Sequence, residues 1–550
     1  MSRPHVLIVG GSGVFGSRLA RLLARRHAFR ISLAGRSETR AVPLQRELRA
    51  IDEQGEFAYV HLDRDTIGVE RLKEIGCDLV VDCSGPFQSS GTQLVEAAIG
   101  ARCHYLDIAD SRAFVGSISR FDSAARAVGI SVISGASSTP ALTHAVLDGV
   151  TSAWLSIDSI DVAIVPGNKT PKGRSVIEAI LSWVGQRVRV FREASWEHHH
   201  GWDDPRWVAI EGLPRRRAVL ADVPDLDLLP ARFAPRVRAG FDAGMELPIL
   251  NWLIALAALP VKWGIMKSAK PFAGIGTAIA NWLHRFGTSE GGMLVEASGQ
   301  DARGEPRVVR WSLKAADGDG PYVPVVPAAA LIWAQLADHR IRAGARPAVG
   351  MLTLEQVRPW FEGLAIETNQ MAFRGEKPLY RRVMGEGFDR LPEATRLIHR
   401  GRPAVIADGE AVVAPADNAV GRFIARLIGV PATEGRQPLR VVIESRDGRE
   451  HWTRFFADHP MRSVMSAAPG GLIEERFGAV AIRMQLVPRT DGLDMVRVSG
   501  RLWGMPLPGF LLPTIKAEER VDEGGRHRFE VDIGLPLFGR LVAYRGYLIV

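Results

Sequence analysis

The chain has 550 residues, more than one ordinary hydrophobic core can organise, so roughly two to four domains are expected. Its net charge of +8 comes mainly from arginines scattered along the sequence, and short clusters such as Arg215–Arg217 are not interleaved with aromatic residues. Because a nucleic-acid footprint needs basic residues gathered on one face, this distribution argues against a nucleic-acid partner.

The three cysteines, Cys77, Cys83 and Cys103, form no CxxC pair, and their odd number argues against a disulfide framework. The first residues lead directly into a buried-strand pattern, without the charged region, apolar stretch and cleavage site of a signal peptide. We therefore expect a protein of a reducing compartment, the cytoplasm.

The segment HVLIVGG (5–11) is an apolar run ending in glycine, which is typical of a parallel strand buried on both faces. A G-x-G-x-x-G turn follows at once, and then a helix with leucines at helical spacing. In this pattern glycines permit a tight turn, close approach of a pyrophosphate and close packing of the helix on the strand. The sequence therefore predicts a dinucleotide site built from Gly10, Gly11, Ser12, Gly13, Val14, Phe15 and Gly16.

The second expected strand, RISLAG (30–35), is followed by Arg36 and Ser37. A site for NAD usually places a carboxylate at this position, whereas a guanidinium complements a 2′-phosphate in charge and bidentate geometry. Ser37 adds a hydroxyl donor. An exposed arginine after a strand is the alternative interpretation, but the pattern favours NADP(H) over NAD(H).

Strands and helices continue to alternate up to about residue 140. Further strands are expected over 57–63, 77–87, 104–110 and 131–137, and the first of these ends at Asp63, near the expected adenine position. Strands alternating with helices predict a Rossmann-type doubly wound parallel sheet over residues 1–140, with ligands at the carboxyl ends of the strands.

The glycine turn, AGRS (34–37), CSGPFQSSGTQLVEAAIGARCHYLDIAD (83–110) and PAVGMLTLEQV (347–357) resemble the saccharopine dehydrogenase-like family of NAD(P)-dependent oxidoreductases. The resemblance covers about residues 1–370. It implies that the loop Ser84, Gly85, Pro86 and Phe87 approaches the nicotinamide half of the cofactor. The family commonly has a glutamate a few residues after the Tyr-x-Asp strand end, whereas this chain has Asp110 followed by Ser111.

None of the six tyrosines has a lysine four residues later, which excludes an active short-chain dehydrogenase. Hydride transfer to a carbonyl or imine still benefits from a positioned acid. The candidates expected at the carboxyl edge of the sheet are Asp107, Asp110, His104 and His144. For His144 the alternative is a helix histidine packed at a domain junction, and for Asp107 a cofactor or structural contact.

Residues 141–320 predict an α+β substrate domain, with a strand at 157–167, a helix at 175–185 and paired strands at 291–301 and 306–316. The segment WEHHHGWDDPRW (196–207) contains three consecutive histidines beside two aspartates. Since neighbouring residues in a strand alternate faces, we expect a substrate-lining or surface loop there and no metal site.

Residues 245–266 are apolar over nearly the length that spans a bilayer, but Pro248, Asn251 and Pro260 interrupt them. Trp252 and Trp263 lie near the two ends. A buried or interfacial helix pair is the favoured interpretation, and peripheral membrane contact through 245–266 and a membrane span are the alternatives.

Residues 321–376 predict a helical return segment that, in the family, packs on the nucleotide domain and makes that domain discontinuous. Residues 371–385 are expected to form a linker. The alternating strands and turns of residues 377–550 predict an antiparallel β domain, a curved sheet or a barrel, which resembles an uncharacterised domain attached to such oxidoreductases. Its Arg454, Arg476 and Arg545 are candidates for an anion pocket, with solvated or structural roles as the favoured alternative.

These patterns predict an NADP(H)-dependent oxidoreductase of saccharopine dehydrogenase-like type that transfers hydride to an apolar carbonyl, imine or alkene. The apolar character of that small-molecule substrate rests on the stretch Leu247–Trp282. The alternative is a non-catalytic NADP(H)-binding sensor or scaffold, located peripherally at a membrane. The oligomeric state stays open, with a homodimer as one option.

Overall fold

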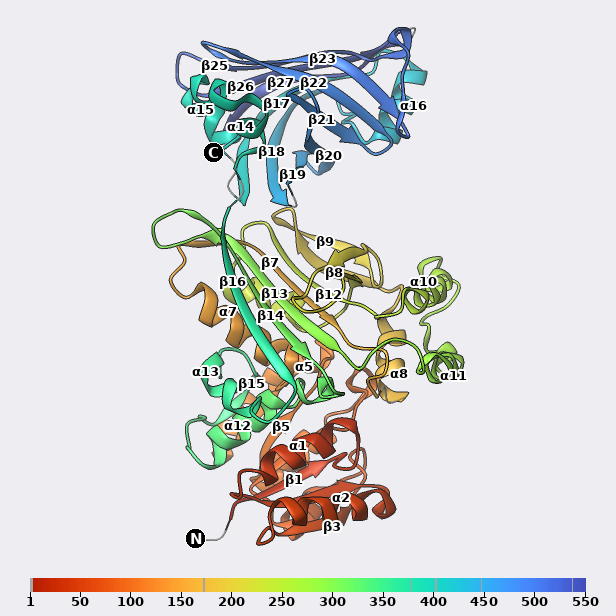
Figure 1. Ribbon diagram of the computed structural model, residues 1–550, viewed down its shortest axis with the longest axis vertical. Coiled ribbons are helices and arrows are strands. Elements are labelled where there is room, and N and C mark those ends of the chain that lie inside the picture. The colour runs from red at the N-terminus through yellow and green to blue at the C-terminus, as the bar shows by residue number, and fades with distance from the viewer. Residues whose placement is uncertain (1–2, 172–173, 376, 401–402, 447, 537) are drawn as a thin grey trace. The chain divides into compact units, whose positions relative to one another are not determined.

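The computed structural model describes residues 3–171, 174–375, 377–400, 403–446, 448–536 and 538–550. The chain folds into two compact units (Figure 1). Unit 1 comprises Met1–Arg192, Trp196–Ala297 and Val309–Ala372, and unit 2 comprises Glu193–Ser195, Ser298–Val308 and Phe373–Val550. Unit 1 contains two sheets, and unit 2 is organised around a third.

The first sheet of unit 1 is parallel and has the strand order β15-β6-β5-β4-β1-β2-β3. Its strands are β1 (His5–Val9), β2 (Arg30–Gly35), β3 (Phe57–His61), β4 (Leu79–Asp82), β5 (His104–Asp107), β6 (Ser131–Ser134) and β15 (Gly344–Pro347). The helices between them are α1 (Val14–Ala24), α2 (Glu38–Ile51), α3 (Val69–Ile75), α4 (Gln93–Ala101), α5 (Arg112–Ser117) and α6 (Asp122–Val128). The predicted doubly wound parallel sheet is confirmed.

The order of the first six strands places a topological switch point between β1 and β4. The chain builds outward from β1 through β2 to β3, and then returns to the other side of β1 with β4. Ligands of open parallel sheets bind outside the carboxyl ends of the strands at such a point. The expected strands are right in type, but the structure ends β3 two residues before Asp63.

The seventh strand comes from a distant part of the chain. The helix α12 (Val326–Leu336) packs against α1, where Phe29 and Trp333 form an edge-to-face pair with ring centroids 5.9 Å apart. The chain then forms β15, which pairs in parallel with β6. The return segment therefore completes the nucleotide sheet, and α12, almost fully buried, covers one of its helices.

The second sheet of unit 1 is mixed, in the order β10-β11-β12-β7-β13-β14-β16, with β8 paired to β12 and β9. Its strands are β7 (Ser156–Val165), β8 (Arg187–Arg192), β9 (Ser195–His200), β10 (Arg206–Val208), β11 (Arg216–Leu220), β12 (Arg238–Ala243), β13 (Gly291–Gln300), β14 (Pro306–Ala315) and β16 (Ile366–Arg374). The expected pairing of 291–301 with 306–316 is confirmed.

Two expectations about this region are wrong. The histidine-rich segment forms the strand β9, paired with β8, and not a loop. Residues 371–374 do not belong to a linker, because they continue the long strand β16. The helices of the region are α7 (Thr143–Thr151), α8 (Arg174–Trp183), α9 (Asp225–Phe233), α10 (Pro248–Lys262) and α11 (Ala273–Leu283).

Unit 2 is a closed antiparallel barrel of ten strands, because β22 pairs with both β21 and β23. Its strands are β17 (Ala404–Pro415), β18 (Gly435–Arg446), β19 (Arg449–Phe456), β20 (His459–Ala468), β21 (Leu472–Phe477), β22 (Val480–Arg489), β23 (Gly492–Leu502), β25 (Thr514–Val521), β26 (His527–Leu535) and β27 (Gly539–Ile549), with the short β24 (Met505–Pro506) beside β23. Three helices accompany them: α14 (Leu379–Met384), α15 (Glu393–Ile398) and α16 (Ala419–Ile428).

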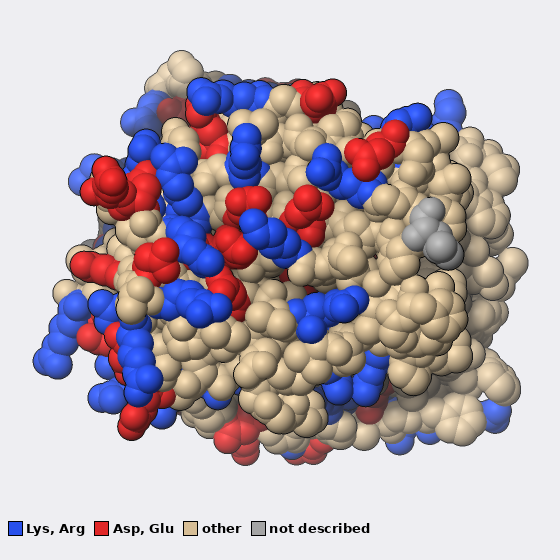
Figure 2. Space-filling view, turned by 90° about the horizontal axis from the view of Figure 1, so that it is seen from above, with Lys and Arg blue, Asp and Glu red and all other residues tan. Residues whose placement is uncertain are grey.

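Basic and acidic side chains intermingle on the face of the molecule shown in Figure 2. Several arginines of unit 2 form ion pairs, such as Arg440 with Asp408 at 2.7 Å and Arg520 with Asp494 at 2.6 Å. On the face that Figure 2 shows, the basic side chains lie among acidic ones and do not form the continuous basic patch that a nucleic-acid backbone would need.

Candidate functional site

The glycine turn closes tightly between β1 and α1. Gly10 has a φ of +73°, and its amide N–H and that of Gly11 both donate to the carbonyl oxygen of Ala34, at 2.9 and 3.2 Å. A Cβ on Gly16 would lie 2.3 Å from the carbonyl oxygen of Gly10, so only glycine allows α1 to approach β1 this closely. Gly13 is exposed and caps α1 without a side-chain hydrogen bond, which leaves the helix N–H groups open to an anion.

Arg36 and Ser37 lie at the carboxyl end of β2, next to this turn in the sheet. Arg36 is exposed, and within the described part of the chain no carboxylate lies at ion-pair distance from its guanidinium. Ser37 contacts the Thr39 hydroxyl, Oγ to Oγ1, at 2.9 Å. Asp63 follows β3, half-buried, and accepts a hydrogen bond from the amide of Asp65 at 3.1 Å.

The loop Ser84–Phe87 after β4 is held by two side chains that sequence analysis missed, Asp82 and Arg64. The Ser84 amide and hydroxyl both donate to Asp82 Oδ1, at 2.9 and 2.5 Å, and Arg64 Nη1 donates to the Ser84 carbonyl oxygen at 2.6 Å. Arg64 Nη1 also lies 3.0 Å from Asp82 Oδ2, and its guanidinium is 5.2 Å from the Phe87 ring centroid. Full burial raises the pKa of Asp82, and the charge of Arg64 opposes that shift.

Asp110 is the one predicted proton donor that reaches solvent beside this loop. Its Oδ1 accepts a hydrogen bond of 3.0 Å from Nε2 of Gln88, which belongs to the turn η1 (Phe87–Ser89). The carboxyl is solvent-accessible but densely surrounded by protein, and this desolvation raises its pKa, against the lowering effect of the Gln88 bond. A carboxyl group whose pKa is raised in this way stays protonated to higher pH than a free aspartate, and a protonated carboxyl can donate a proton.

Asp107 is completely buried. Its Oδ1 accepts hydrogen bonds from the amides of Ala109 and Gly135, at 2.9 and 2.8 Å, and from the Ser134 hydroxyl at 2.9 Å. Burial raises the pKa of Asp107 to about 6, although these donors act in the opposite direction. The geometry favours the structural role over direct proton transfer, because the carboxyl ties the ends of β5 and β6 together.

The two histidine candidates are also held inside the fold. His144 is fully buried in α7, where its Nδ1 lies 3.3 Å from Arg232 Nη1 and its Nε2 lies 3.5 Å from Asp225 Oδ1, both on α9. This arrangement fits the alternative of a packed histidine that joins two helices. The placement of His104 at the carboxyl edge is wrong: it begins β5, and its Nδ1 accepts a hydrogen bond from the Ser131 amide at the opposite edge.

The histidine-rich strand β9 is organised by ion pairs. His199 Nδ1 lies 2.8 Å from Asp204 Oδ2 and its Nε2 lies 3.3 Å from Glu197 Oε2. These hydrogen bonds, that to Asp204 above all, raise the pKa of His199 to about 9, and the same contact lowers the pKa of Asp204 to about 2. Across the residues that the structure describes, no cluster of three or more ligating side chains could hold a metal ion.

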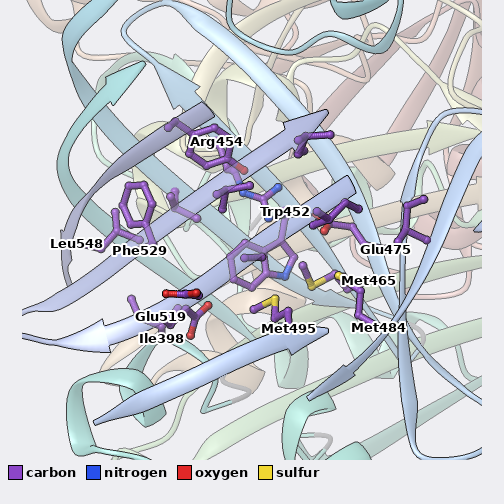
Figure 3. A pocket seen from close by; sticks show the side chains of 18 of the residues that line it. Ile398, Trp452, Arg454, Met465, Glu475, Met484, Met495, Glu519, Phe529 and Leu548 are labelled. Atoms are coloured by element: carbon purple, nitrogen blue, oxygen red, sulfur yellow. Dashed lines mark hydrogen bonds and ion pairs between the residues drawn. The ribbon is translucent and has the colours of Figure 1, made fainter. Parts of the chain in front are cut away.

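The barrel interior encloses a cavity of about 90 Å³ with apolar walls and buried charges (Figure 3). Arg454 Nη2 lies 3.1 Å from Glu475 Oε1, its Nη1 donates to the Ser463 hydroxyl at 2.9 Å, and its guanidinium stands 4.8 Å from the Trp452 ring centroid. Arg476 is exposed and pairs with Glu474, and Arg545 is exposed. The three arginines therefore do not share one anion pocket.

A second polar cluster lies in the same interior. His399 Nε2 is 2.8 Å from Glu519 Oε2, and the His399 ring stacks on Tyr380 with centroids 3.7 Å apart. His527 Nε2 is 3.9 Å from the same carboxylate oxygen. Burial acts to raise the pKa of Glu519, but the two neighbouring histidines outweigh it and the pKa is lowered.

Two family models match separate parts of the chain, one within unit 1 and the other within unit 2. Residues 6–147 match the family model of the saccharopine dehydrogenase NADP binding domain, and residues 391–548 match that of a domain of unknown function. No curated protein matches the chain. Among solved structures, apo saccharopine dehydrogenase (L-Glu forming) from Saccharomyces cerevisiae is 13% identical, with coverage of 67% of this chain and 100% of that one and a TM-score of 0.48. FolM alternative dihydrofolate reductase 1 from Brucella canis, complexed with NADP, is 16% identical, with coverages of 24% and 71% and a TM-score of 0.19.

The first part of the chain is thus a Rossmann-type NADP(H)-binding domain, the class that the glycine turn and the strand order define. Residues 6–147 belong to the saccharopine dehydrogenase NADP-binding domain family, as their motifs predicted, and this membership supports an oxidoreductase. The barrel belongs to a family without an assigned function.

Replacement of Gly16 by alanine tests the close packing of the turn. We expect Gly16→Ala to lower the free energy of unfolding by about 1–3 kcal/mol and to weaken NADPH binding, because the new methyl meets a backbone oxygen that cannot rotate away. Thermal melting and NADPH fluorescence titration measure the two effects. The control Gly116→Ala adds a methyl at an exposed helix position with open space around it. Equal behaviour of the two variants would contradict the packing argument.

The buried ion pair of Arg454 with Glu475 predicts that its loss lowers the stability of the barrel more than the loss of an exposed ion pair does. We expect Arg454→Ala to destabilise unit 2 by about 3–5 kcal/mol, because it leaves the Glu475 carboxylate buried without its partner. The control Arg440→Ala breaks an exposed pair with Asp408 and should cost less than about 1 kcal/mol. Urea unfolding followed by tryptophan fluorescence compares them, and a similar loss in both would show that Arg454 is not needed to neutralise Glu475.

Proposed function

We propose that this protein is an NADPH-dependent reductase that delivers a hydride and a proton to an apolar or amphipathic carbonyl, imine or alkene. The observation that carries the proposal is the convergence of four features at one edge of the sheet. These are the open amino end of α1, the unpaired guanidinium of Arg36, the braced loop Ser84–Phe87 and the accessible carboxyl of Asp110.

The residues present fit the cofactor. The missing Cβ of Gly13 leaves space at the helix terminus for a pyrophosphate, and Arg36 and Ser37 offer charge and hydroxyl contacts to a 2′-phosphate. NADPH, when bound, supplies the hydride. Asp82 and Arg64 hold the loop Ser84–Phe87 in place for the nicotinamide half, so this part of the site is preformed.

Asp110 supplies the proton in this proposal. Its raised pKa keeps the carboxyl protonated to higher pH, and Gln88 orients it beside the loop. The proton passes from the Asp110 carboxyl to the substrate oxygen, nitrogen or carbon that gains electron density as the adjacent carbon receives the hydride. Solvent then reprotonates the exposed carboxylate.

An apolar groove supports the choice of substrate class. It has a volume of about 540 Å³ and lies between α8, α10 and α11, with a lining that is almost entirely aliphatic and aromatic. The helix α8 contributes Ile177, Ile180 and Leu181 to the groove and also runs beside the turn η1. An alkyl or aryl group bound along α8 would therefore reach toward the loop that approaches the nicotinamide.

The cofactor preference is the first test. We expect the wild-type protein to bind NADPH more tightly than NADH, and Arg36→Ala to lose about tenfold to a hundredfold in NADPH affinity while NADH affinity stays unchanged. Fluorescence titration with both cofactors measures this. Arg46→Ala, an exposed arginine on α2, is the matched control and should bind as wild type does. Equal affinity of the wild type for both cofactors would contradict the role of Arg36.

The proton donor is tested by Asp110→Asn. With NADPH and a panel of long-chain aldehydes, ketones and α,β-unsaturated esters, we expect turnover to fall by about a hundredfold or more at unchanged NADPH affinity. The wild-type rate should fall as the pH rises through the raised pKa of Asp110, and the variant should lose this dependence. Glu53→Gln, an exposed carboxylate of the same domain, serves as the control. NADPH binding without turnover on the whole panel would favour a non-catalytic NADP(H)-binding protein.

A further inference from the structure

The surface formed by residues 247–286, here called the α10–α11 surface, exposes an unusual amount of apolar area. Figure 1 shows the two helices at the side of unit 1, away from the strands of its second sheet. Trp263 and Ile265 are 68% and 72% exposed. The other large apolar side chains exposed here are Ile249, Trp252, Leu256, Ile275, Trp282 and Phe286. Soluble proteins rarely expose a large apolar patch to water, and such a patch usually marks a surface that binds another molecule.

The two helices have little support of their own. Only four residues of α10 and two of α11 are buried, and the small core beneath them consists of Leu181, Val261, Ala269 and Ala273. The apolar groove of about 540 Å³ opens between these helices and α8. Leu256, Trp263 and Ile275 are exposed and also line this groove, so the groove is continuous with the exposed apolar surface. A helix pair with this apolar character resembles a segment that lies in an apolar medium.

The charges of this surface specify the kind of partner. The sequence from Leu247 to Ser289 contains no aspartate or glutamate, whereas Lys262, Lys267, Lys270 and Arg285 bring four positive charges. Arg285 lies over Trp282, with its guanidinium carbon 4.9 Å from the ring centroid. Lys262 forms an ion pair with Asp203, whereas Lys267, Lys270 and Arg285 have no carboxylate at ion-pair distance among the described residues. Exposed tryptophans beside such cations match the interfacial region of an anionic membrane.

The lengths of the helices define how they would bind. α10 has 15 residues and α11 has 11, and a span needs about 20. Among the described residues, no helix combines the length and apolar character required to cross a membrane. Helices of this kind lie in the plane of the interface with their apolar side in the acyl region.

We propose that the α10–α11 surface docks unit 1 on the surface of an anionic lipid bilayer. The tryptophans and aliphatic side chains enter the interface, and Lys267, Lys270 and Arg285 contact the headgroup phosphates. The groove between α8, α10 and α11 then opens to the acyl chains.

Vesicle binding tests this proposal and needs no enzyme substrate. Full-length protein is sedimented with vesicles of phosphatidylcholine alone, or of phosphatidylcholine mixed with phosphatidylglycerol. We expect clear binding to the mixed vesicles, and the double variant Trp252→Glu/Trp263→Glu should lower the partition coefficient about a hundredfold, about tenfold for each tryptophan lost. The control Trp207→Glu changes a tryptophan that is 67% exposed on β10, outside this surface, and should bind as wild type does.

A second variant tests how much the positive charges of this surface contribute to vesicle binding. Lys267→Gln/Lys270→Gln/Arg285→Gln should reduce binding to the mixed vesicles roughly a hundredfold, about fivefold for each cation, with little effect on phosphatidylcholine vesicles. High salt should have the same effect on the wild type. Circular dichroism and NADPH titration confirm that each variant is folded.

Two outcomes would overturn the proposal. One is equal vesicle binding by the wild type and Trp252→Glu/Trp263→Glu, or no binding by either. The other is self-association of the wild type in light scattering that this double variant abolishes, since the surface would then be an interface with a second copy of the chain.

Discussion

The carboxyl edge of the parallel sheet depends on two buried carboxylates at neighbouring positions, Asp82 and Asp107. The β4–β5 register places them directly opposite one another, and neither is exposed. Burial raises the pKa of both carboxyls, and the charge of Asp82 adds to the rise at Asp107. Each is stabilised by hydrogen bonds from the loop that follows it or its neighbour: Asp82 by Ser84, and Asp107 by Ala109 and Gly135. The same bonds that satisfy the carboxylates therefore fix the backbone beside the nicotinamide position and beside Asp110.

The two aspartates that follow one another on this edge, Asp107 and Asp110, differ in their access to solvent. Asp107 is locked by three donors and has no access to solvent, whereas Asp110, three residues on, is accessible. The position of Asp110 is fixed by the helix that starts after it, because Ser111 caps α5 and accepts the Phe114 amide at 3.4 Å. In the proposed reductase, this polar edge would hold the cofactor in one geometry and leave the exposed Asp110 carboxyl to face the substrate.

Local patterns were sufficient to predict the nucleotide sheet. An apolar strand, a glycine turn and a helix depend on contacts close in sequence, so β1, α1 and the position of Arg36 follow from residues 5–37. The role of Arg64 depends on a contact made 20 residues away, with Ser84, and nothing around Arg64 in the sequence indicates it. The placement of His104 was wrong although the predicted strand 104–110 already begins with it. The first residue of a strand lies at the amino edge of a parallel sheet, whereas ligands bind at the carboxyl edge.

The barrel shows a different limit of sequence patterns. On β19 the side chains of Trp452 and Arg454 line the interior cavity. Glu450 and Phe456 occupy the same period-two positions of the strand and are buried. Polar residues in a period-two pattern normally mark the solvent face, so alternation alone would assign charged residues to the outside. Only the closed sheet brings Glu475 to Arg454 and Glu519 to His399.

The groove between α8, α10 and α11 of unit 1 and the interior of the barrel differ in the charges of the side chains that line them. The lining of the groove along α8 in unit 1 contains no charged residue, so an apolar molecule that enters the groove displaces no buried charge. In the barrel the buried charges have close partners: Arg454 lies beside Glu475, and Glu519 lies beside His399 and His527. The Glu450 carboxylate accepts a hydrogen bond from the Trp452 indole. Such an interior is costly to rearrange. Of the two interiors, the groove is the one that can exchange its contents without a compensating change in the charges that line it.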